Sequence, residues 1–286
     1  MWVLFGLLTA FFDSLKDVAG KRGLRNADEY LISWAWRFFA LIFLLPLLFF
    51  TGIPKIGSSF WAALAVEGVF ITIATVLYVK ALKHSDLSIT LPMLAFTPLF
   101  LLITSPIMLG EFPSAIGLIG ILLIICGSYT LNIKERKNGY LAPFKALLRE
   151  KGPKLMLIVA ACWSITANID KIGIRNSSPI FWSISLAAFS SLALFPTILF
   201  GREKRLMQIP SKIHALLPIG LASALTLVFQ MYAISMALVP YVVSLKRTSI
   251  LMGVVFGRLI FKEKETRNRF IGAAIMVAGV ILITLA

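Results

Sequence analysis

Long apolar runs recur along the whole chain and constrain its fold more than any other feature. A run of about 17–25 apolar residues lets one helix cross the ~30 Å hydrocarbon core of a bilayer. Such runs fall at ten places, namely residues 2–20, 31–51, 59–81, 88–109, 113–132, 154–173, 179–200, 213–235, 239–261 and 268–285. A soluble core does not need a composition that is 59% hydrophobic and only 14% charged. We therefore predict an all-α, multi-pass protein of the cell membrane with ten transmembrane helices.

The two halves of the chain repeat each other. The stretch SLKDVAGKRGLRN (14–26) aligns with SITANIDKIGIRN (164–176). Further on, Glu111, Gly120 and Gly127 match Glu263, Gly272 and Gly279. Each half holds five predicted helices, an odd number, so the second half must cross the membrane in the opposite sense. We predict two inverted five-helix repeats, at residues 1–132 and 154–286, joined by a basic interfacial linker at residues 133–153.

The charge pattern is typical of membrane topology. The net charge is +15, but the basic residues lie mostly in short connections between apolar runs. Connections on one side of the predicted bundle carry 20 Lys and Arg residues, and those on the other side carry three. The positive-inside rule would then place both termini outside the cell. This pattern excludes nucleic acid as a partner and predicts contact with a lipid bilayer.

No pattern of catalytic or metal-binding residues is present. The residues considered are Cys126 and Cys162, which lie inside apolar runs, and His84 and His214, which are isolated. Their spacing fits neither a disulfide framework nor a metal site, and no Ser-His or Cys-His arrangement accompanies them. We predict no metal, no cofactor and no enzymatic activity. The N-terminal run lacks a basic start and a small-residue cleavage site, so we expect it to be a retained first helix.

The closing segments of the two halves carry a family resemblance. These segments are GEFPSAIGLIGILLIICG and KEKETRNRFIGAAIMVAGV. Together with Arg37 early in the second predicted helix, they resemble the EamA-like members of the drug/metabolite transporter superfamily over nearly the whole chain. The second half departs from the pattern at Ala187, which matches Arg37. The resemblance implies a secondary transporter that works by alternating access. It also implies cytoplasmic termini, whereas the charge pattern places both termini outside the cell. Membership in such a family does not name a substrate.

Two adjacent cations interrupt the ninth apolar run. Lys246 and Arg247 lie near the middle of LVPYVVSLKRTSILMGVVFG, where each costs about 2.5–3.5 kcal/mol at a helix centre. An Arg and a Lys around one polar space suit an oxyanion. The stretch also resembles the paired Lys-Arg in the ninth helix of plastidic phosphate translocators, which implies an anionic or phosphorylated substrate. The competing interpretation, compatible with the first, is that they neutralise buried carboxylates, for which Glu67, Asp13 and Asp17 are the candidates.

Polar residues also follow helical spacing in the first and sixth predicted helices. In the first helix, Lys16 is placed to pair with Asp13 and Asp17 to pair with Lys21. In the sixth, the stripe is Ser164, Asn168, Lys171 and Arg175. We expect both polar faces to line a cavity, with Trp36 and Trp163 as walls. The predicted substrate-binding residues are Lys246, Arg247, Lys16, Asp17, Arg37, Asp13 and Glu67.

These residues lead to one predicted function and two alternatives. The prediction is a secondary transporter of a small polar metabolite that is anionic or phosphorylated. Within transport, the alternative is a proton-coupled exporter of amino acids or related zwitterions, in which Glu67 would matter more than the Lys-Arg pair. From another class, the alternative is a membrane enzyme or scaffold acting on lipid-linked substrates. The oligomeric state stays open between monomer and homodimer.

Overall fold

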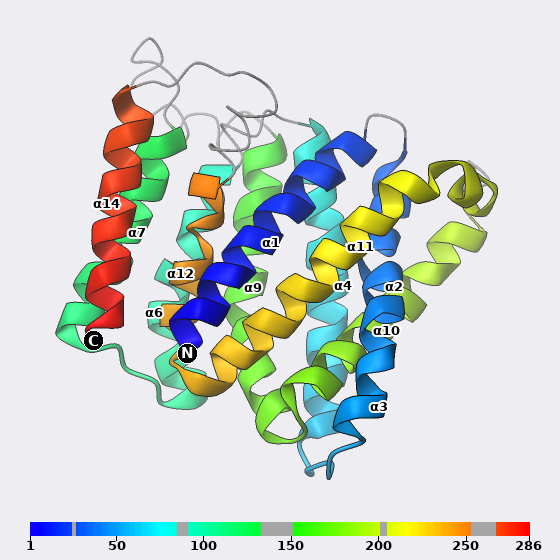
Figure 1. Cartoon of the computed structure of the whole chain (residues 1–286), viewed down its shortest axis with the longest axis horizontal. Coiled ribbons are helices and arrows are strands. Elements are labelled where there is room, and N and C mark those ends of the chain that lie inside the picture. Colours follow the sequence, from blue (N-terminus) through cyan, green and yellow to red (C-terminus); the bar gives the residue numbers. More distant parts are fainter. Residues whose placement is uncertain (25–26, 85–90, 133–150, 201–204, 253–266) are drawn as a thin grey trace.

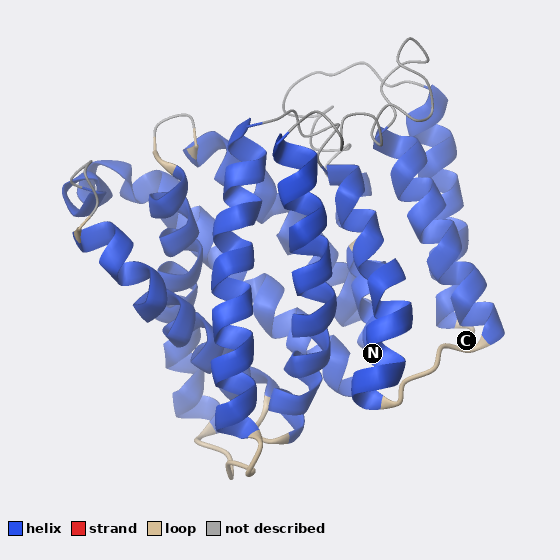
Figure 2. Cartoon of the chain, turned by 180° about the vertical axis from the view of Figure 1, so that it is seen from behind, coloured by secondary structure: helices blue, strands red, loops and turns tan. Residues whose placement is uncertain are grey.

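The fold is a bundle of helices packed side by side. The computed structural model describes residues 1–24, 27–84, 91–132, 151–200, 205–252 and 267–286. Every regular element within these residues is helical (Figure 2). The first and last residues lie at the same end of the bundle (Figure 1).

The helices follow the predicted order of apolar runs. In the first half they are α1 (Trp2–Gly23), α2 (Glu29–Leu44), η1 (Leu45–Leu47), α3 (Leu48–Thr51), α4 (Phe60–His84), η2 (Leu91–Ala95), α6 (Phe96–Leu109) and α7 (Ala115–Asn132). In the second half they are α9 (Lys151–Arg175), α10 (Pro179–Leu199), α11 (Arg205–Met236), α12 (Val239–Lys246) and α14 (Arg267–Thr284).

Five of the described segments are long and apolar enough to cross a membrane. They are Glu29–Thr51, Phe60–His84, Lys151–Arg175, Pro179–Leu199 and Met207–Met236. Three shorter apolar helices, Met93–Leu109, Ala115–Thr130 and Ile271–Thr284, accompany them. The all-helical membrane architecture is thus confirmed, whereas the number of ten crossings stays a prediction. The linker predicted at residues 133–153 lies largely outside the described residues.

Local signals in the sequence explain where several helices begin and end. The side chain of Asp28 accepts a hydrogen bond from the Leu31 N–H at 2.7 Å, which caps the start of α2. Ser178 caps α10 with Pro179 at its first position, where a missing N–H costs nothing. Helix α6 ends at Gly110, whose φ of +68° places it in the left-handed region that glycine adopts without strain.

Most of the helix contacts join one half of the chain to the other. Helix α1 packs against α11, α4 against α9, and α2 against α10 and α11. Helices α7 and α14 meet through the predicted glycines: a Cβ atom added to Gly120 would lie 2.8 Å from the Gly279 carbonyl oxygen, and one on Gly127 would lie 2.7 Å from that of Gly272. Glycine at these positions therefore lets the two backbones touch, as small residues do in membrane helices.

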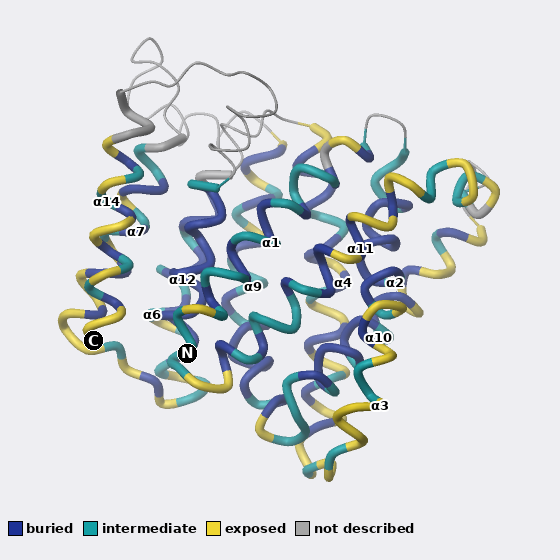
Figure 3. The backbone as a smooth tube through the Cα atoms, in the orientation of Figure 1, coloured by how far each residue is buried: buried dark blue, intermediate teal, exposed yellow. Residues whose placement is uncertain are grey.

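The outside of the bundle is apolar. Exposed residues lie along the outward-facing sides of the helices, whereas buried residues face the centre (Figure 3). The exposed set includes large apolar side chains such as Phe49, Ile107, Leu192 and Phe200. A soluble surface would not expose so many of them. This distribution fits a protein whose outer face contacts lipid.

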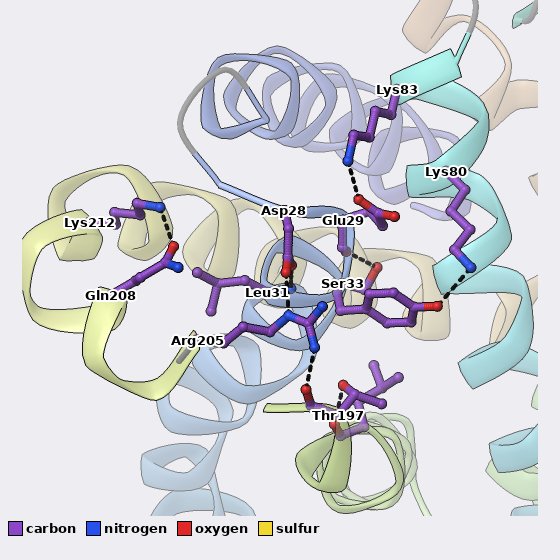
Figure 4. Close-up of polar contacts among 12 residues, drawn as sticks. Asp28, Glu29, Leu31, Ser33, Lys80, Lys83, Thr197, Arg205, Gln208 and Lys212 are labelled. Atoms are coloured by element: carbon purple, nitrogen blue, oxygen red, sulfur yellow. Dashed lines mark hydrogen bonds and ion pairs between the residues drawn. The ribbon is translucent and has the colours of Figure 1, made fainter. Parts of the chain in front are cut away.

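A polar cluster joins four helices at one end of the bundle (Figure 4). Arg205, at the start of α11, forms an ion pair with the capping residue Asp28 and donates a hydrogen bond to the Thr197 carbonyl oxygen of α10 at 2.6 Å. Next to it, Lys83 of α4 pairs with Glu29 of α2 at 2.5 Å. The cluster fixes the ends of α2 and α4 against those of α10 and α11.

Candidate functional site

The adjacent cations Lys246 and Arg247 lie at a break in the helix. Helix α12 ends at Lys246, and Arg247 is its C-cap. The Arg247 and Thr248 N–H groups each donate to a carbonyl three residues back, at 3.0 Å, which tightens the turn. Helical structure resumes at residues 249–252, and the rest of the predicted span lies outside the described residues. Within the described residues, the predicted ninth helix is thus interrupted by a turn at residues 247–248. The dipole of α12 favours cations at its C-terminus.

Lys246 has partners on two other helices. Its ammonium group donates a hydrogen bond to Gln230 Oε1 of α11 at 2.8 Å and lies 3.5 Å from Asp13 Oδ1 of α1. The same Asp13 oxygen accepts a hydrogen bond from Lys16 at 2.5 Å. The predicted pairing of Lys16 with Asp13 is thus present. The alternative of internal neutralisation accounts for part of the Lys246 charge.

Arg247 is differently placed. Its side chain is 2% exposed, and its Nε atom has no hydrogen-bond partner among the described residues. Its guanidinium carbon lies 5.6 Å from the Trp163 ring centre, and Lys246 Nζ lies 5.5 Å from the same ring. A tryptophan face attracts cations through its quadrupole. Trp163 thus holds both cations, but no carboxylate lies within ion-pair distance of Arg247 in the described parts of the chain.

Arg37 of α2 provides a second guanidinium group in which at least one N–H donor has no acceptor among the described residues. One terminal nitrogen donates to Thr75 Oγ1 of α4 at 2.9 Å. Its Nε atom is buried and has no partner within the described residues. A buried donor without an acceptor is costly. Arg37 therefore keeps an Nε–H donor without an acceptor among the described residues.

These groups surround one cavity of about 70 Å³ between the helices. Helices from both halves of the chain line it. Its polar and aromatic lining consists of Lys16, Trp36, Arg37, Glu67, Thr75, Trp163, Thr166, Asp170, Ser223, Thr226, Gln230, Lys246 and Arg247. We refer to this space as the central cavity. A concave site with converging polar groups is the usual form of a small-molecule site.

Five of the seven predicted substrate-binding residues line the central cavity. They are Lys16, Arg37, Glu67, Lys246 and Arg247. Asp13 contacts the cavity cations without lining the cavity, and Asp17 accepts a hydrogen bond from the Tyr78 hydroxyl at 3.0 Å. The predicted partner of Asp17 was Lys21, whose side chain lies outside the described residues. Trp36 and Trp163 line the cavity, as expected.

Asp170 of α9 is a cavity residue that the sequence analysis missed. Its Oδ1 atom accepts a hydrogen bond from the Trp182 indole N–H of α10 at 2.9 Å. Its carboxyl group is also within hydrogen-bonding range of the Glu67 carboxyl group. A charged residue inside the apolar run at 154–173 was the available signal. It lies off the polar stripe on which the prediction concentrated.

That stripe does not line the central cavity. Asn168 accepts a hydrogen bond from the Ser105 hydroxyl of α6 at 2.7 Å, so this part of α9 packs against α6. Lys171 forms a buried ion pair with Glu111. The face that meets the central cavity carries Trp163 and Asp170 instead. Polar side chains on this stripe join helices, because a hydrogen bond to a neighbouring helix satisfies them as well as water does.

A second cavity, of about 590 Å³, lies toward the end of the bundle that holds the chain termini. Lys171 and Arg175 line it together with Tyr241. Next to Lys171, Glu111 accepts hydrogen bonds from the Lys171 ammonium group and, at 2.8 Å, from the Val239 N–H that begins α12. One carboxylate therefore ties the first half of the chain to two helices of the second half.

Comparison with known proteins agrees with this architecture. A model of the EamA-like transporter family matches residues 1–133 and 150–285. The chain belongs to this family. This EamA-like protein is thus a multi-pass membrane protein of the drug/metabolite transporter kind, and the predicted resemblance is confirmed.

Solved structures support the fold of this EamA-like protein. One titled "Crystal structure of protein" superposes with a TM-score of 0.78 at 16% sequence identity, over 99% of this chain and 96% of that chain. At this identity the likeness concerns the fold alone. No curated protein matches the chain significantly. Family membership supports the transport of small molecules and leaves the substrate class to the chemistry of the central cavity.

Proposed function

We propose that the chain is a secondary transporter that moves a small anionic metabolite across the cell membrane by alternating access. The substrate's carboxylate or phosphate group binds in the central cavity between Lys246 and Arg247, with Arg37 on the α2 and α4 side. The observation that carries this proposal is the pair of buried guanidinium groups with unsatisfied Nε donors facing one space. Arg donors of this kind match the oxygens of carboxylates and phosphates.

The charges around the cavity support an anion. Lys246 has partial neutralisation from Asp13, whereas no ion pair is formed by Arg37 or Arg247 in the described part of the chain. The dipole at the end of α12 offsets part of the cost of Lys246 and Arg247 when the cavity is empty. A bound anion would offset more, which makes binding favourable. Alternating access then requires the two halves to move against each other around this site.

One observation favours the zwitterion alternative. Glu67 and Asp170 place carboxyl groups in the same cavity as the cations. A substrate ammonium group would fit near them while its carboxylate met Arg247. Amino acids therefore belong among the compounds to be tested.

The proposal is tested by thermal unfolding of the purified protein with a panel of compounds. The panel contains inorganic phosphate, sugar phosphates, dicarboxylates, nucleotides and neutral amino acids. A ligand that binds only the folded state raises the unfolding temperature by mass action. We expect an anion to stabilise the wild type and to lose this effect in the Lys246→Gln/Arg247→Gln variant.

The matched control is a Lys55→Gln/Lys83→Gln variant, which removes two exposed cations away from the cavity. It is expected to respond to the anion as the wild type does. Stabilisation by neutral amino acids alone would favour the zwitterion alternative. An equal anion response in all three proteins would refute a role for Lys246 and Arg247 in binding.

A further inference from the structure

The two carboxyl groups of Glu67 and Asp170, here called the carboxyl pair, are not used by the anion site. Glu67 is 1% exposed and Asp170 is 4% exposed. They come from different halves of the chain, from α4 and α9, and both line the central cavity. Buried carboxylates are rarely left without a cation or a donor. The hydrogen-bond donors and cations around the two carboxyl groups therefore determine whether these groups are ionised.

The hydrogen bonding of the carboxyl pair requires a proton. The Oε2 atom of Glu67 finds no N–H or O–H donor among the described residues. The Asp170 carboxyl group lies within hydrogen-bonding range of Glu67. Two carboxylates cannot hydrogen-bond to each other, and like charges this close in a buried site cannot both ionise. One proton between them satisfies both conditions.

No neighbouring cation replaces this proton by direct contact. Arg37 directs a terminal nitrogen to Thr75 and forms no ion pair with either carboxyl group. Lys246 donates to Gln230 and lies near Asp13. The groups that face the pair from the surrounding helices are Lys16 on α1, Arg37 on α2, Trp182 on α10, Gln230 on α11, Lys246 on α12 and Arg247 just beyond it. Of these, only Trp182 donates a hydrogen bond to the pair in the described part of the chain.

We propose that Glu67 and Asp170 form a proton-binding site that holds one proton between them and couples its uptake to anion binding in the same cavity. The coupling rests on the proposed function above. A proton on the pair removes one negative charge from the cavity wall and so favours an incoming anion. By thermodynamic reciprocity, a bound anion favours the proton equally. The transporter would then carry a proton together with its anion.

The proton site is tested first by infrared spectroscopy of the full chain in liposomes, across a pH titration. A protonated carboxylic acid absorbs at a carbonyl frequency separate from that of a carboxylate. At neutral pH we expect a protonated-carboxyl band in the wild type that both Glu67→Gln and Asp170→Asn remove. Glu29→Gln, which changes a carboxylate outside the cavity, should leave it unchanged.

Two results of the infrared experiment would overturn the proton site. Absence of a Glu67-dependent band in the wild type would mean that both groups are ionised. A band that survives in Asp170→Asn would mean that Glu67 is protonated through burial alone, so no proton is shared. This readout needs no substrate, so it decides the proton site even if the anion proposal fails.

The coupling is tested with sulfate as the probe, because its charge does not change near neutral pH. We expect the wild type to bind sulfate about 5-fold or more tightly at pH 6 than at pH 8, as measured by thermal shift. Glu67→Gln should remove this dependence while retaining sulfate binding. An unchanged pH dependence in Glu67→Gln refutes the coupling. If the wild type binds no sulfate at either pH, the proposed anion site is refuted, and with it the coupling.

Discussion

Replacing Glu111 with glutamine is expected to lower the free energy of unfolding by about 3–5 kcal/mol, because it leaves a buried cation without its counter-ion. The Glu111 side chain is 7% exposed and that of Lys171 is 9% exposed. The carboxylate serves two donors, Lys171 and the Val239 N–H. A glutamine side chain offers one acceptor oxygen, so one of the two donors loses this acceptor, and Lys171, which also donates to the Ala237 carbonyl oxygen at 2.8 Å, loses its counter-ion.

The chain contains a matched control for this prediction. Glu29 and Lys83 form an ion pair of similar length, but the Lys83 side chain is 46% exposed. Exposed ion pairs contribute about 0–1 kcal/mol, because water and salt screen them. Glu29→Gln should therefore cost far less than Glu111→Gln.

The measurement is reversible unfolding of the purified protein in mixed micelles, completed by a double-mutant cycle with Lys171→Met. If the loss comes from an uncompensated cation, the Glu111→Gln/Lys171→Met variant should recover part of it, so that the two single effects are not additive. Equal losses for Glu111→Gln and Glu29→Gln, or strict additivity in the cycle, would refute the reasoning.

Two further predictions concern helix packing and helix capping. Gly127→Ala is expected to destabilise the protein by about 1–3 kcal/mol, because the new Cβ atom would lie 2.7 Å from the Gly272 carbonyl oxygen. The measurement is thermal unfolding, with Gly20→Ala as the control, because a Cβ atom at Gly20 would lie 3.5 Å from its nearest neighbour. Equal losses of stability in the two variants would contradict the packing argument. Asp28→Ala should lower the free energy of unfolding by about 1 kcal/mol more than Asp28→Asn does, because asparagine keeps the cap of α2 and loses only the ionic pairing with Arg205. Identical unfolding curves for the two variants would show that the cap contributes nothing.

The break after α12 shows where prediction from the sequence stopped. The apolar run from 239 to 261 predicts one continuous span, and neither glycine nor proline marks an interruption near Lys246. The helix nevertheless ends there. The ending places two cations at a helix C-terminus beside Trp163 and Asp13. The contacts that these cations make with other helices are not visible in the local sequence.

The polar face of α9 shows a second limit. Helical spacing identifies Ser164, Asn168 and Lys171 as one stripe, and a stripe in a membrane helix must face protein or water. Periodicity cannot distinguish these two environments. The stripe meets α6 and Glu111, whereas Asp170, which belongs to no stripe, meets Glu67 across the cavity.

What the sequence determined by itself was the placement of the helices and their repeated arrangement, because the bilayer imposes the length and apolarity of a crossing segment regardless of its neighbours. It also identified most of the costly charges, with Asp170 as the exception, since hydrocarbon tolerates few of them. Which of these charges meet each other was decided only by the tertiary structure. Lys246 from α12 reaches Asp13 from α1, and Glu67 from α4 reaches Asp170 from α9, because helices far apart in the sequence pack side by side.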